Sequence, residues 1–141
     1  AFFTRGQRKN SMEFHHVGVA TSDAEEFVTV LKDRLGLQIV HEERFDGLRI
    51  AFLDLGAGYV EVLEPIGETG PVARFLDRRG QGIHHLALRV NDIVGALSAA
   101  RTAGARAIDE EPRPGAWGHE VAFLHPDSTG GVLVELVEEG E

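Results

Sequence analysis

Four side chains that could bind a metal ion occur in the sequence as two matched pairs. His16 and Glu61 lie in the first half of the chain, and His85 and Glu135 lie at corresponding places in the second half. Imidazole nitrogens and carboxylate oxygens are donors that suit Co²⁺, Ni²⁺, Zn²⁺ or Mn²⁺. The chain has no cysteine, which excludes thiolate sites and disulfides. These residue types predict one divalent cation held by two histidines and two glutamates.

The correspondence rests on an internal repeat of the sequence. The run HHVGVA at residues 15–20 aligns with HHLALR at residues 84–89, which lies 69 residues later. Further matches follow in the same order: 35–37 with 103–105, 51–53 with 122–124, and 60–62 with 134–136. The number of residues between matched segments increases where the second copy has a longer hairpin. Insertions are tolerated at turns, so this is where two copies of a module are expected to differ in length. We therefore predict a duplication, and not a ferredoxin-like α+β domain with accidental similarity.

Each copy is expected to fold as a βαβββ module, which makes the chain an α+β protein. In the first copy the pattern predicts a helix at 23–34 and strands at 14–20, 37–42, 48–55 and 58–64. In the second it predicts a helix at 92–103 and strands at 83–90, 105–109, 119–124 and 131–138. Ser22 and Asn91 are the expected N-caps, and Gly36 and Gly104 are the expected helix ends.

The same pattern predicts the domain boundaries. One domain covers residues 12–139, with module one at about 13–66, a linker at about 67–81 that contains a short helical piece at 72–79, and module two at about 82–139. Residues 1–11 contain basic residues but not the apolar core of a signal peptide. We expect this stretch to be a disordered leader or a cloning remnant.

Strand alternation places the four candidate ligands on one face, because successive side chains of a strand point to opposite faces. In the first strand the apolar alternate residues are expected to pack under the helix, whereas His16 points the other way. Glu61, His85 and Glu135 occupy equivalent positions between apolar neighbours in their own strands. An ionised glutamate in such a strand is unfavourable unless it is paired or bound to a metal.

Residues beside these four have simpler expected roles. Gly18 and Ala87 are expected to leave room for a substrate next to the metal, and His15 and His84 are expected to point to the opposite face in structural or supporting roles. Taken singly, each candidate histidine could be an ordinary hydrogen-bonded residue, and each candidate glutamate could line an exposed edge. The symmetric placement of all four favours metal binding.

Composition excludes several classes of function. The chain's 141 residues are enough for one domain with a buried core, and no apolar run reaches the roughly 18–20 residues that span a membrane. With 14 basic and 23 acidic residues, the net charge of −9 argues against nucleic acid as a partner. We expect a soluble, cytoplasmic protein. Arg74, Arg78 and Arg79 could face an anionic ligand, although solvent exposure is the simpler interpretation.

Longer segments resemble the methylmalonyl-CoA epimerases, a family of the vicinal-oxygen-chelate (glyoxalase, bleomycin resistance and dioxygenase) superfamily. The resemblance runs from about residue 13 to about residue 137, and its most specific segments are RGQGIHHLA at 79–87 and DEEPRPGA at 109–116. It implies two βαβββ modules with curved mixed sheets around a metal site, a homodimer, and an acyl-CoA substrate. The metal ligands of the family fall on His16, Glu61, His85 and Glu135, the same four residues that strand alternation selects.

The resemblance also implies an activity, the metal-dependent interconversion of (2R)- and (2S)-methylmalonyl-CoA by proton abstraction at carbon 2 through a metal-stabilised enolate. Inversion needs a base on one face of the substrate and an acid on the other. Glu135 is expected to be one of these groups and Glu61 the second, with Glu43 or a water molecule as other options. Two positions depart from the family: Ile50 replaces a glutamate that some members use as an acid or base, and Asp127 replaces a lysine found in many members.

Other functions of the same fold stay open. A glyoxalase I-like lactoylglutathione lyase would use the same four ligands, so metal content alone does not distinguish it. A ring-cleaving dioxygenase is disfavoured because it holds iron with two histidines and one carboxylate, and a fourth protein ligand would fill an open position. A non-enzymatic ligand-binding module of this fold typically lacks the metal ligands.

Overall fold

The chain runs twice through the same order of elements, one strand, one helix and three strands. The first half contains β1 (Glu13–Ala20), α1 (Ala24–Leu35), β2 (Ile39–Phe45), β3 (Leu48–Asp54) and β4 (Tyr59–Pro65). After α2 (Pro71–Arg79), the second half contains β5 (Gly82–Arg89), α3 (Ile93–Thr102), β6 (Arg113–Pro114), β7 (Glu120–Leu124) and β8 (Val134–Glu138). The predicted α+β fold of two βαβββ modules is confirmed by this computed structural model, which describes residue 2 and residues 11–140.

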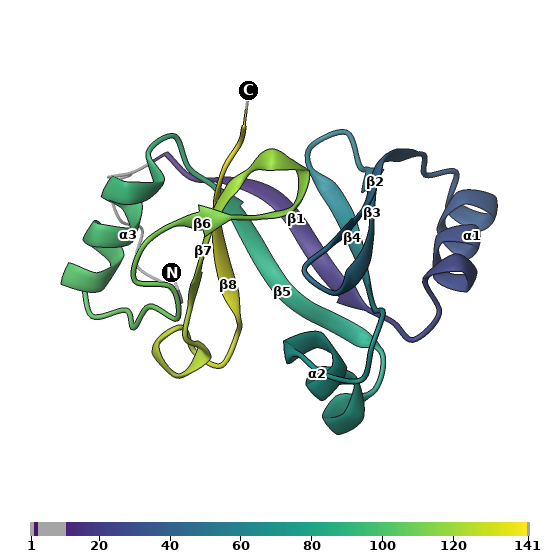
Figure 1. Cartoon of the computed structure of the whole chain (residues 1–141). Coiled ribbons are helices and arrows are strands. Elements are labelled where there is room, and N and C mark those ends of the chain that lie inside the picture. Colours follow the sequence, from purple (N-terminus) through teal and green to yellow (C-terminus); the bar gives the residue numbers. More distant parts are fainter. Residues whose placement is uncertain (1, 3–10, 141) are drawn as a thin grey trace.

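One eight-stranded sheet joins the two halves, with the strand order β2-β3-β4-β1-β5-β8-β7-β6. Within each half the first and last strands are parallel, β1 with β4 and β5 with β8. The antiparallel pair β1–β5 connects the halves at the centre of the sheet. Figure 1 shows the sheet curling between α1 and α3, which lie at its two outer flanks, while α2 lies near one end of β5. The two modules therefore pair within one chain.

Apolar clusters attach the two long helices to the sheet. Leu31 of α1 packs with Leu53 and Val62, both of which are fully buried. Leu97 of α3 packs in the same way against Leu136 of β8. Burial of these side chains supplies most of the driving force for the fold, and it leaves the opposite face of the central strands free for polar residues.

The helix N-caps differ from the prediction. Asp23 and Asp92 are the capping residues, and their carboxylates accept hydrogen bonds from the backbone N–H groups of Glu26 and Gly95. Ser22, one residue earlier, instead donates its backbone N–H to the Gln81 side chain at 3.0 Å. A carboxylate at the cap also interacts favourably with the helix dipole. The predicted end of α1 at Gly36 is confirmed, because Gly36 adopts the left-handed conformation with φ 72°.

The strand predicted at residues 105–109 does not form. Only an isolated bridge between Ala107 and Leu124 occurs there, and the strand that pairs with β7 is the two-residue β6. The carboxylate of Asp109 accepts the backbone N–H of Phe123 at 2.9 Å and thereby replaces a ladder bond. The prolines at 112 and 114 shorten the pairing further because they have no N–H to donate.

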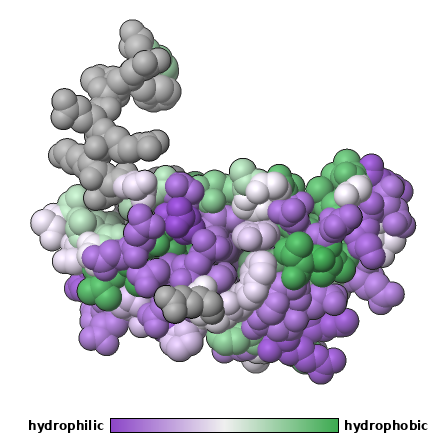
Figure 2. All heavy atoms as spheres, turned by 90° about the horizontal axis from the view of Figure 1, so that it is seen from above, coloured by the Kyte–Doolittle hydropathy of each residue, from purple (hydrophilic) through white to green (hydrophobic). Residues whose placement is uncertain are grey.

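Two expectations concern the ends and the surface of the chain. Most of the predicted leader at 1–11 lies outside the described residues. Among the residues that the structure describes, no helix has the length and apolar character needed to cross a membrane. Hydrophilic side chains cover most of the face shown in Figure 2, with apolar groups gathered in separate patches.

Candidate metal centre

His16, Glu61, His85 and Glu135 meet where the two halves of the sheet join. The Nε2 atoms of His16 and His85 lie 3.0 Å apart. Each Nε2 atom lies 3.1–3.2 Å from Oε1 of Glu61 and from Oε1 of Glu135. The donor atoms of His16, Glu61 and His85 all lie within 4.8 Å of one another, whereas Glu135 is close to both histidines but is not part of this mutually close group. The structure thus brings all four predicted ligands to the joint, with each glutamate beside both histidines.

The register of the central strands explains this convergence. Gly18 of β1 lies between Glu61 on β4 and His85 on β5. Ala87 of β5 lies in the same way between His16 on β1 and Glu135 on β8. Each small residue thus has a glutamate on one side and a histidine from the other half of the chain on the other side.

Gly18 has a different role from the one expected. A Cβ atom at this position would lie 2.2 Å from Cε1 of His85 and 2.5 Å from Nδ1 of the same ring. The space above Gly18 is therefore filled by the His85 imidazole and is not open to a substrate. Only glycine allows this ring to lie so close to the strand.

All four side chains are buried, and their charges balance. Burial lowers the pKa of His85, but the carboxylates of Glu135 and Glu61 outweigh it and raise the pKa to about 10. Burial likewise opposes the charge of Glu135 and of Glu61, yet His16 and His85 hold the pKa of both carboxyl groups below the usual range. Without a cation, the two carboxylates therefore favour the protonated form of His16 and His85, and the two histidines favour the ionised form of Glu61 and Glu135.

The donor geometry fits a divalent cation better than it fits this set of ions. Neighbouring donors around a cation at typical N and O bond lengths lie roughly 3–3.5 Å apart. Glu135 Oε1 is buried and has no hydrogen-bond partner among the described residues, although the Nε2 atoms of His16 and His85 are close to it. The two Nε2 atoms at 3.0 Å cannot both direct a proton along the line between them. A cation at the centre would use all four sets of lone pairs.

The preceding histidine of each pair supports the ligand histidine directly. His15 Nδ1 lies 2.6 Å from Nδ1 of His16, and His84 Nδ1 lies 2.9 Å from Nδ1 of His85. Burial, with the adjacent ligand histidine as a further cause, lowers the pKa of both His15 and His84 to about 4, so both rings are neutral acceptors. These contacts agree with the expected structural or supporting roles, which stay a prediction. The two rings do not point to the opposite face as expected, because each contacts the ring of its neighbour. In β1 the register shifts between Phe14 and His16, which allows His15 to contact its neighbour.

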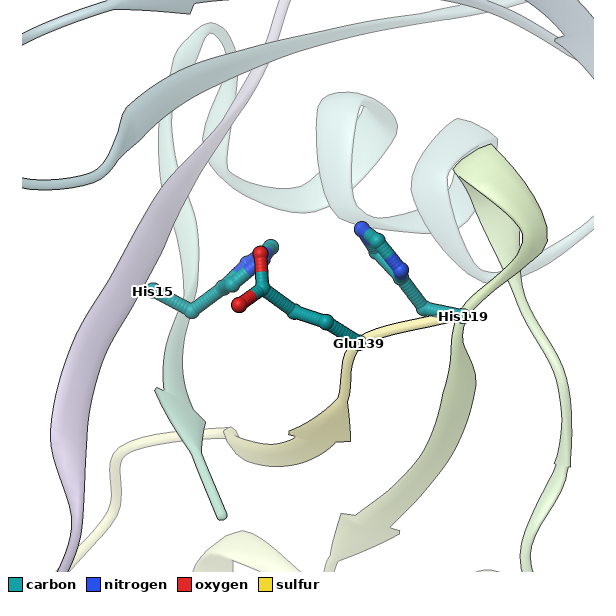
Figure 3. Close-up of side chains that lie close together, drawn as sticks. All are labelled: His15, His119 and Glu139. Atoms are coloured by element: carbon teal, nitrogen blue, oxygen red, sulfur yellow. The ribbon is translucent and has the colours of Figure 1, made fainter. Parts of the chain in front are cut away.

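Figure 3 shows a second group of possible ligands, His15, His119 and Glu139. The group adjoins the first, because His15 contacts His16. Its donor atoms lie within 4.8 Å of one another, and Nε2 of His15 is 3.4 Å from Oε2 of Glu139. However, His119 Nδ1 accepts the backbone N–H of Gly140, which leaves the proton of this ring on Nε2. His15, when it accepts from His16 through Nδ1, also carries its proton on Nε2. His15 and His119 therefore each present an Nε2–H donor beside the Glu139 carboxylate, and neither Nε2 atom offers a lone pair to a cation.

One feature near the site has no counterpart in the sequence analysis. The Trp117 indole stacks on the His41 ring with centroids 4.7 Å apart and an angle of 2° between the planes. Glu43 contacts His41 through its carboxylate and accepts the backbone N–H of Trp117 at 2.9 Å. Trp117 has a φ of 61°, a conformation that non-glycine residues rarely adopt. Neither strand alternation nor helical spacing could predict this contact, because Trp117 lies in an irregular loop of the second half.

Ile50, which the resemblance places where some epimerases have a glutamate, lies in a cluster of buried apolar residues. It is 5% exposed and packs with Ala20, Phe52, Leu63 and Val72. Trp117 is a partly buried neighbour of this cluster. This position therefore offers no carboxylate. Glu43 is the partner of Ile50 across the β2–β3 ladder, and the His41 ring lies 6.1 Å from the ring of Phe52, centroid to centroid.

Comparisons with known proteins agree with the fold. Residues 15–123 match the family model of the glyoxalase/bleomycin resistance protein/dioxygenase superfamily. The ethylmalonyl-CoA/methylmalonyl-CoA epimerase of Cereibacter sphaeroides is 37% identical over 86% of this chain and 94% of its own length. The crystal structure of methylmalonyl-CoA epimerase from Mycobacterium tuberculosis superposes with a TM-score of 0.88 at 38% identity, covering 92% of this chain and 89% of that chain.

A third relative carries a ligand. The structure of a methylmalonyl-CoA epimerase in complex with methylmalonyl-CoA and NH4+ has a TM-score of 0.87 at 34% identity and covers 92% of this chain and 95% of that chain. Coverage on this scale includes most of both halves of the chain. The chain therefore belongs to the glyoxalase/bleomycin resistance protein/dioxygenase superfamily, and within it resembles the methylmalonyl-CoA epimerases.

Proposed function

We propose that this chain is an isomerase that interconverts (2R)- and (2S)-methylmalonyl-CoA with the help of one divalent cation. The observation that carries the proposal is the convergence of His16, Glu61, His85 and Glu135 at the joint between the modules. This convergence occurs in a chain that is 37% identical to an epimerase over nearly the whole length of that enzyme.

The four ligands would hold the cation, which we propose to be Co²⁺, Ni²⁺, Zn²⁺ or Mn²⁺. When bound, it would act as a Lewis acid and stabilise negative charge that develops on the oxygen atoms of the substrate. His15 and His84 accept the Nδ1–H groups of His16 and His85 and so fix the tautomer and orientation of both ligand rings. The four side chains are buried, and a substrate bound beside them would be shielded from bulk water.

Proton transfer is assigned to the two glutamates. In one direction the ionised Glu135 takes the proton from carbon 2 on one face of the substrate, and Glu61, which must carry a proton when the reaction starts, gives that proton to the opposite face. Exchange with solvent then removes the proton from Glu135 and returns one to Glu61, and the two roles are exchanged in the reverse direction. In each glutamate, Oε1 is the oxygen that faces the histidines. We therefore assign the exchange of a proton with the substrate to Oε2 of the same carboxylate. Because Ile50 offers no third carboxylate, inversion depends on these two residues, with Glu43 or a water molecule as the alternative second group.

Proton NMR of the metal-loaded protein with methylmalonyl-CoA in D₂O tests this function. We expect metal-dependent uptake of deuterium at carbon 2, faster than the background exchange, together with conversion of one epimer into the other. A parallel reaction with the methylglyoxal–glutathione hemithioacetal tests for a lactoylglutathione lyase. Turnover of the hemithioacetal without exchange at carbon 2 would refute the epimerase proposal.

Three further parts of the proposal rest on the resemblance and the sequence pattern. These are a homodimer, a cytoplasmic location, and the division of residues 12–139 into two modules and a linker. Light scattering coupled to gel filtration gives the mass of the particle, and a monomer at micromolar concentration would contradict the dimer.

A further inference from the structure

One cavity connects the candidate metal centre to a row of arginines. It has a volume of about 450 Å³, and the ligand His85 and its neighbour His84 form part of its wall. Arg74, Arg78 and Arg79 of α2 line it on one side. Residues of the β7–β8 connection and its flanks line it on the other side, among them Pro126, Gly131, Val132 and Leu133. We call this cavity the arginine pocket.

The charge of the arginine pocket differs from that of the rest of the molecule. No Asp or Glu lines it, whereas four other cavities on the described part of the chain each have at least one in their wall. None of its three arginines forms an ion pair with another described residue. Arg49, Arg89, Arg106 and Arg113 are paired with carboxylates, whereas Arg34, Arg44 and Arg101 are also outside the ion pairs of the described residues. The arginine pocket differs in having three such arginines together and no carboxylate in its wall. In a chain of net charge −9, three unpaired guanidinium groups beside one cavity form a local site for an anion.

The spacing of the arginines suits a ligand with several phosphate groups. Arg74 and Arg78 are four residues apart on α2 and therefore lie on the same face of the helix. The Arg79 guanidinium lies over the Phe75 ring at 5.7 Å from its centroid, which limits its freedom to point elsewhere. Guanidinium groups bind phosphate oxygens in a bidentate manner.

The pocket also has an apolar rim. Ile83 is 69% exposed and Val132 is 51% exposed, and both line the cavity. Exposed apolar side chains beside a charged surface suit a ligand whose uncharged arm joins a charged end to a reacting end. The Asp127 carboxylate is held by Arg106 at 2.6 Å on the surface and is not part of the wall.

From these observations we infer that Arg74, Arg78 and Arg79 bind the phosphate groups of a coenzyme A thioester. The adenosine end lies over α2, the pantetheine arm crosses Ile83 and Val132, and the acyl group reaches the metal centre at His85. This inference rests on the proposed function for the identity of the acyl group, but the phosphate site stands on the pocket itself.

The test compares two substrates and two variants. The double variant Arg74→Ala/Arg78→Ala removes two charges from the pocket, and Arg101→Ala removes one exposed arginine of α3 in the other module as the matched control. Methylmalonyl-CoA and the N-acetylcysteamine thioester of methylmalonate share the reacting group, but only the first has phosphates. We expect the double variant to raise KM for methylmalonyl-CoA about tenfold with little change in kcat. Its kinetics with the short thioester, and both sets of kinetics for Arg101→Ala, should match the parent protein.

A binding measurement separates the inference from the proposed function. Titration calorimetry with adenosine 3′,5′-bisphosphate should show binding to the parent chain that weakens with salt and is lost in the double variant, while inorganic phosphate binds more weakly. If the parent chain binds the nucleotide through these arginines but does not exchange the proton at carbon 2, the pocket stands and the epimerase proposal fails. Unchanged nucleotide binding in the double variant, or an equal effect on both thioesters, would overturn the inference.

Discussion

At the scale of single residues, Glu61 and Glu135 hold equivalent positions but differ in what can replace them. The resemblance to the epimerases implies that a glutamine can stand in place of Glu61, so an amide oxygen is expected to serve as a ligand there. We expect Glu61→Gln to bind the cation within about tenfold of the parent affinity, yet to lose at least ~100-fold in epimerisation, because the amide cannot transfer a proton. Full activity of this variant would remove Glu61 from the acid–base role and leave it as a ligand.

Glu135→Gln should weaken metal binding and also abolish epimerisation. It replaces a buried carboxylate whose Oε1 lies 3.1 Å from His16 Nε2 and 3.2 Å from His85 Nε2. We expect at least a tenfold loss of metal affinity and no measurable exchange at carbon 2. Glu120→Gln, at an exposed position of β7, is the matched control and should behave as the parent. Metal content by mass spectrometry and exchange by NMR give the two readouts.

Metal binding should release protons. The pKa of His85 is raised to about 10 by Glu135 and Glu61 against the effect of burial, so this ring is protonated in the metal-free protein at pH 7. A cation needs the neutral ring, and therefore it must displace this proton. The apparent affinity should rise as the pH increases from 7 towards 10. Calorimetry in two buffers with different ionisation enthalpies counts the protons, and equal heats in both buffers would contradict the prediction.

At the scale of elements, the close contact between β1 and the His85 ring should make Gly18 sensitive to the smallest substitution. A Cβ at Gly18 would lie 2.2 Å from the ring, so Gly18→Ala must displace His85. We expect a loss of about 1–3 kcal/mol in the free energy of unfolding and at least a tenfold loss in metal affinity. The same substitution at Gly67, where a Cβ would meet nothing within 4 Å, should have little effect.

The start of α1 offers a second test at this scale. Asp23→Ala removes the carboxylate that accepts the Glu26 N–H and should lower the free energy of unfolding by about 1 kcal/mol. Ser22→Ala, one residue earlier, should change it by less than half as much, because Ser22 does not cap the helix. Chemical denaturation of the two variants in parallel measures the difference. Equal losses would place the cap at Ser22 after all.

Elements with a strong periodic pattern could be predicted from the sequence, and elements that depend on side-chain contacts could not. The strands that carry the four candidate ligands alternate regularly, so their faces and the residues that would meet were predicted. The pattern at residues 105–109, after α3, predicted a strand. In the structure the Asp109 carboxylate accepts the backbone N–H of Phe123, and this bond takes the place of a backbone bond between strands. The Trp117 loop shows no period at all, and its stacking on His41 arises from contacts between distant segments. The four ligand roles themselves stay a prediction until metal binding is measured.

At the scale of the whole molecule, a bound cation should stabilise the fold because its ligands come from both modules. Ligand present at about 1,000 times its dissociation constant adds roughly 4 kcal/mol to the free energy of unfolding. For a chain of this size we expect the melting temperature to rise by about 10 °C when Zn²⁺ or Co²⁺ is added to chelator-treated protein. Glu135→Gln should show little of this rise. A melting temperature that does not respond to the cation in the parent chain would contradict a site that bridges the modules.

The pairing of β1 with β5 has one more consequence. His16 faces Ala87 across this ladder and Gly18 faces His85, and a shift of 69 residues turns the first pair into the second with the strands exchanged. The metal centre therefore sits on a local twofold axis, and each half supplies one histidine and one glutamate to it. Two identical half-length chains related by the same axis would present the same four donors. An ancestor of half this length could have bound the cation as a dimer, and fusion of two copies would then have freed each half to diverge on the side that meets the substrate.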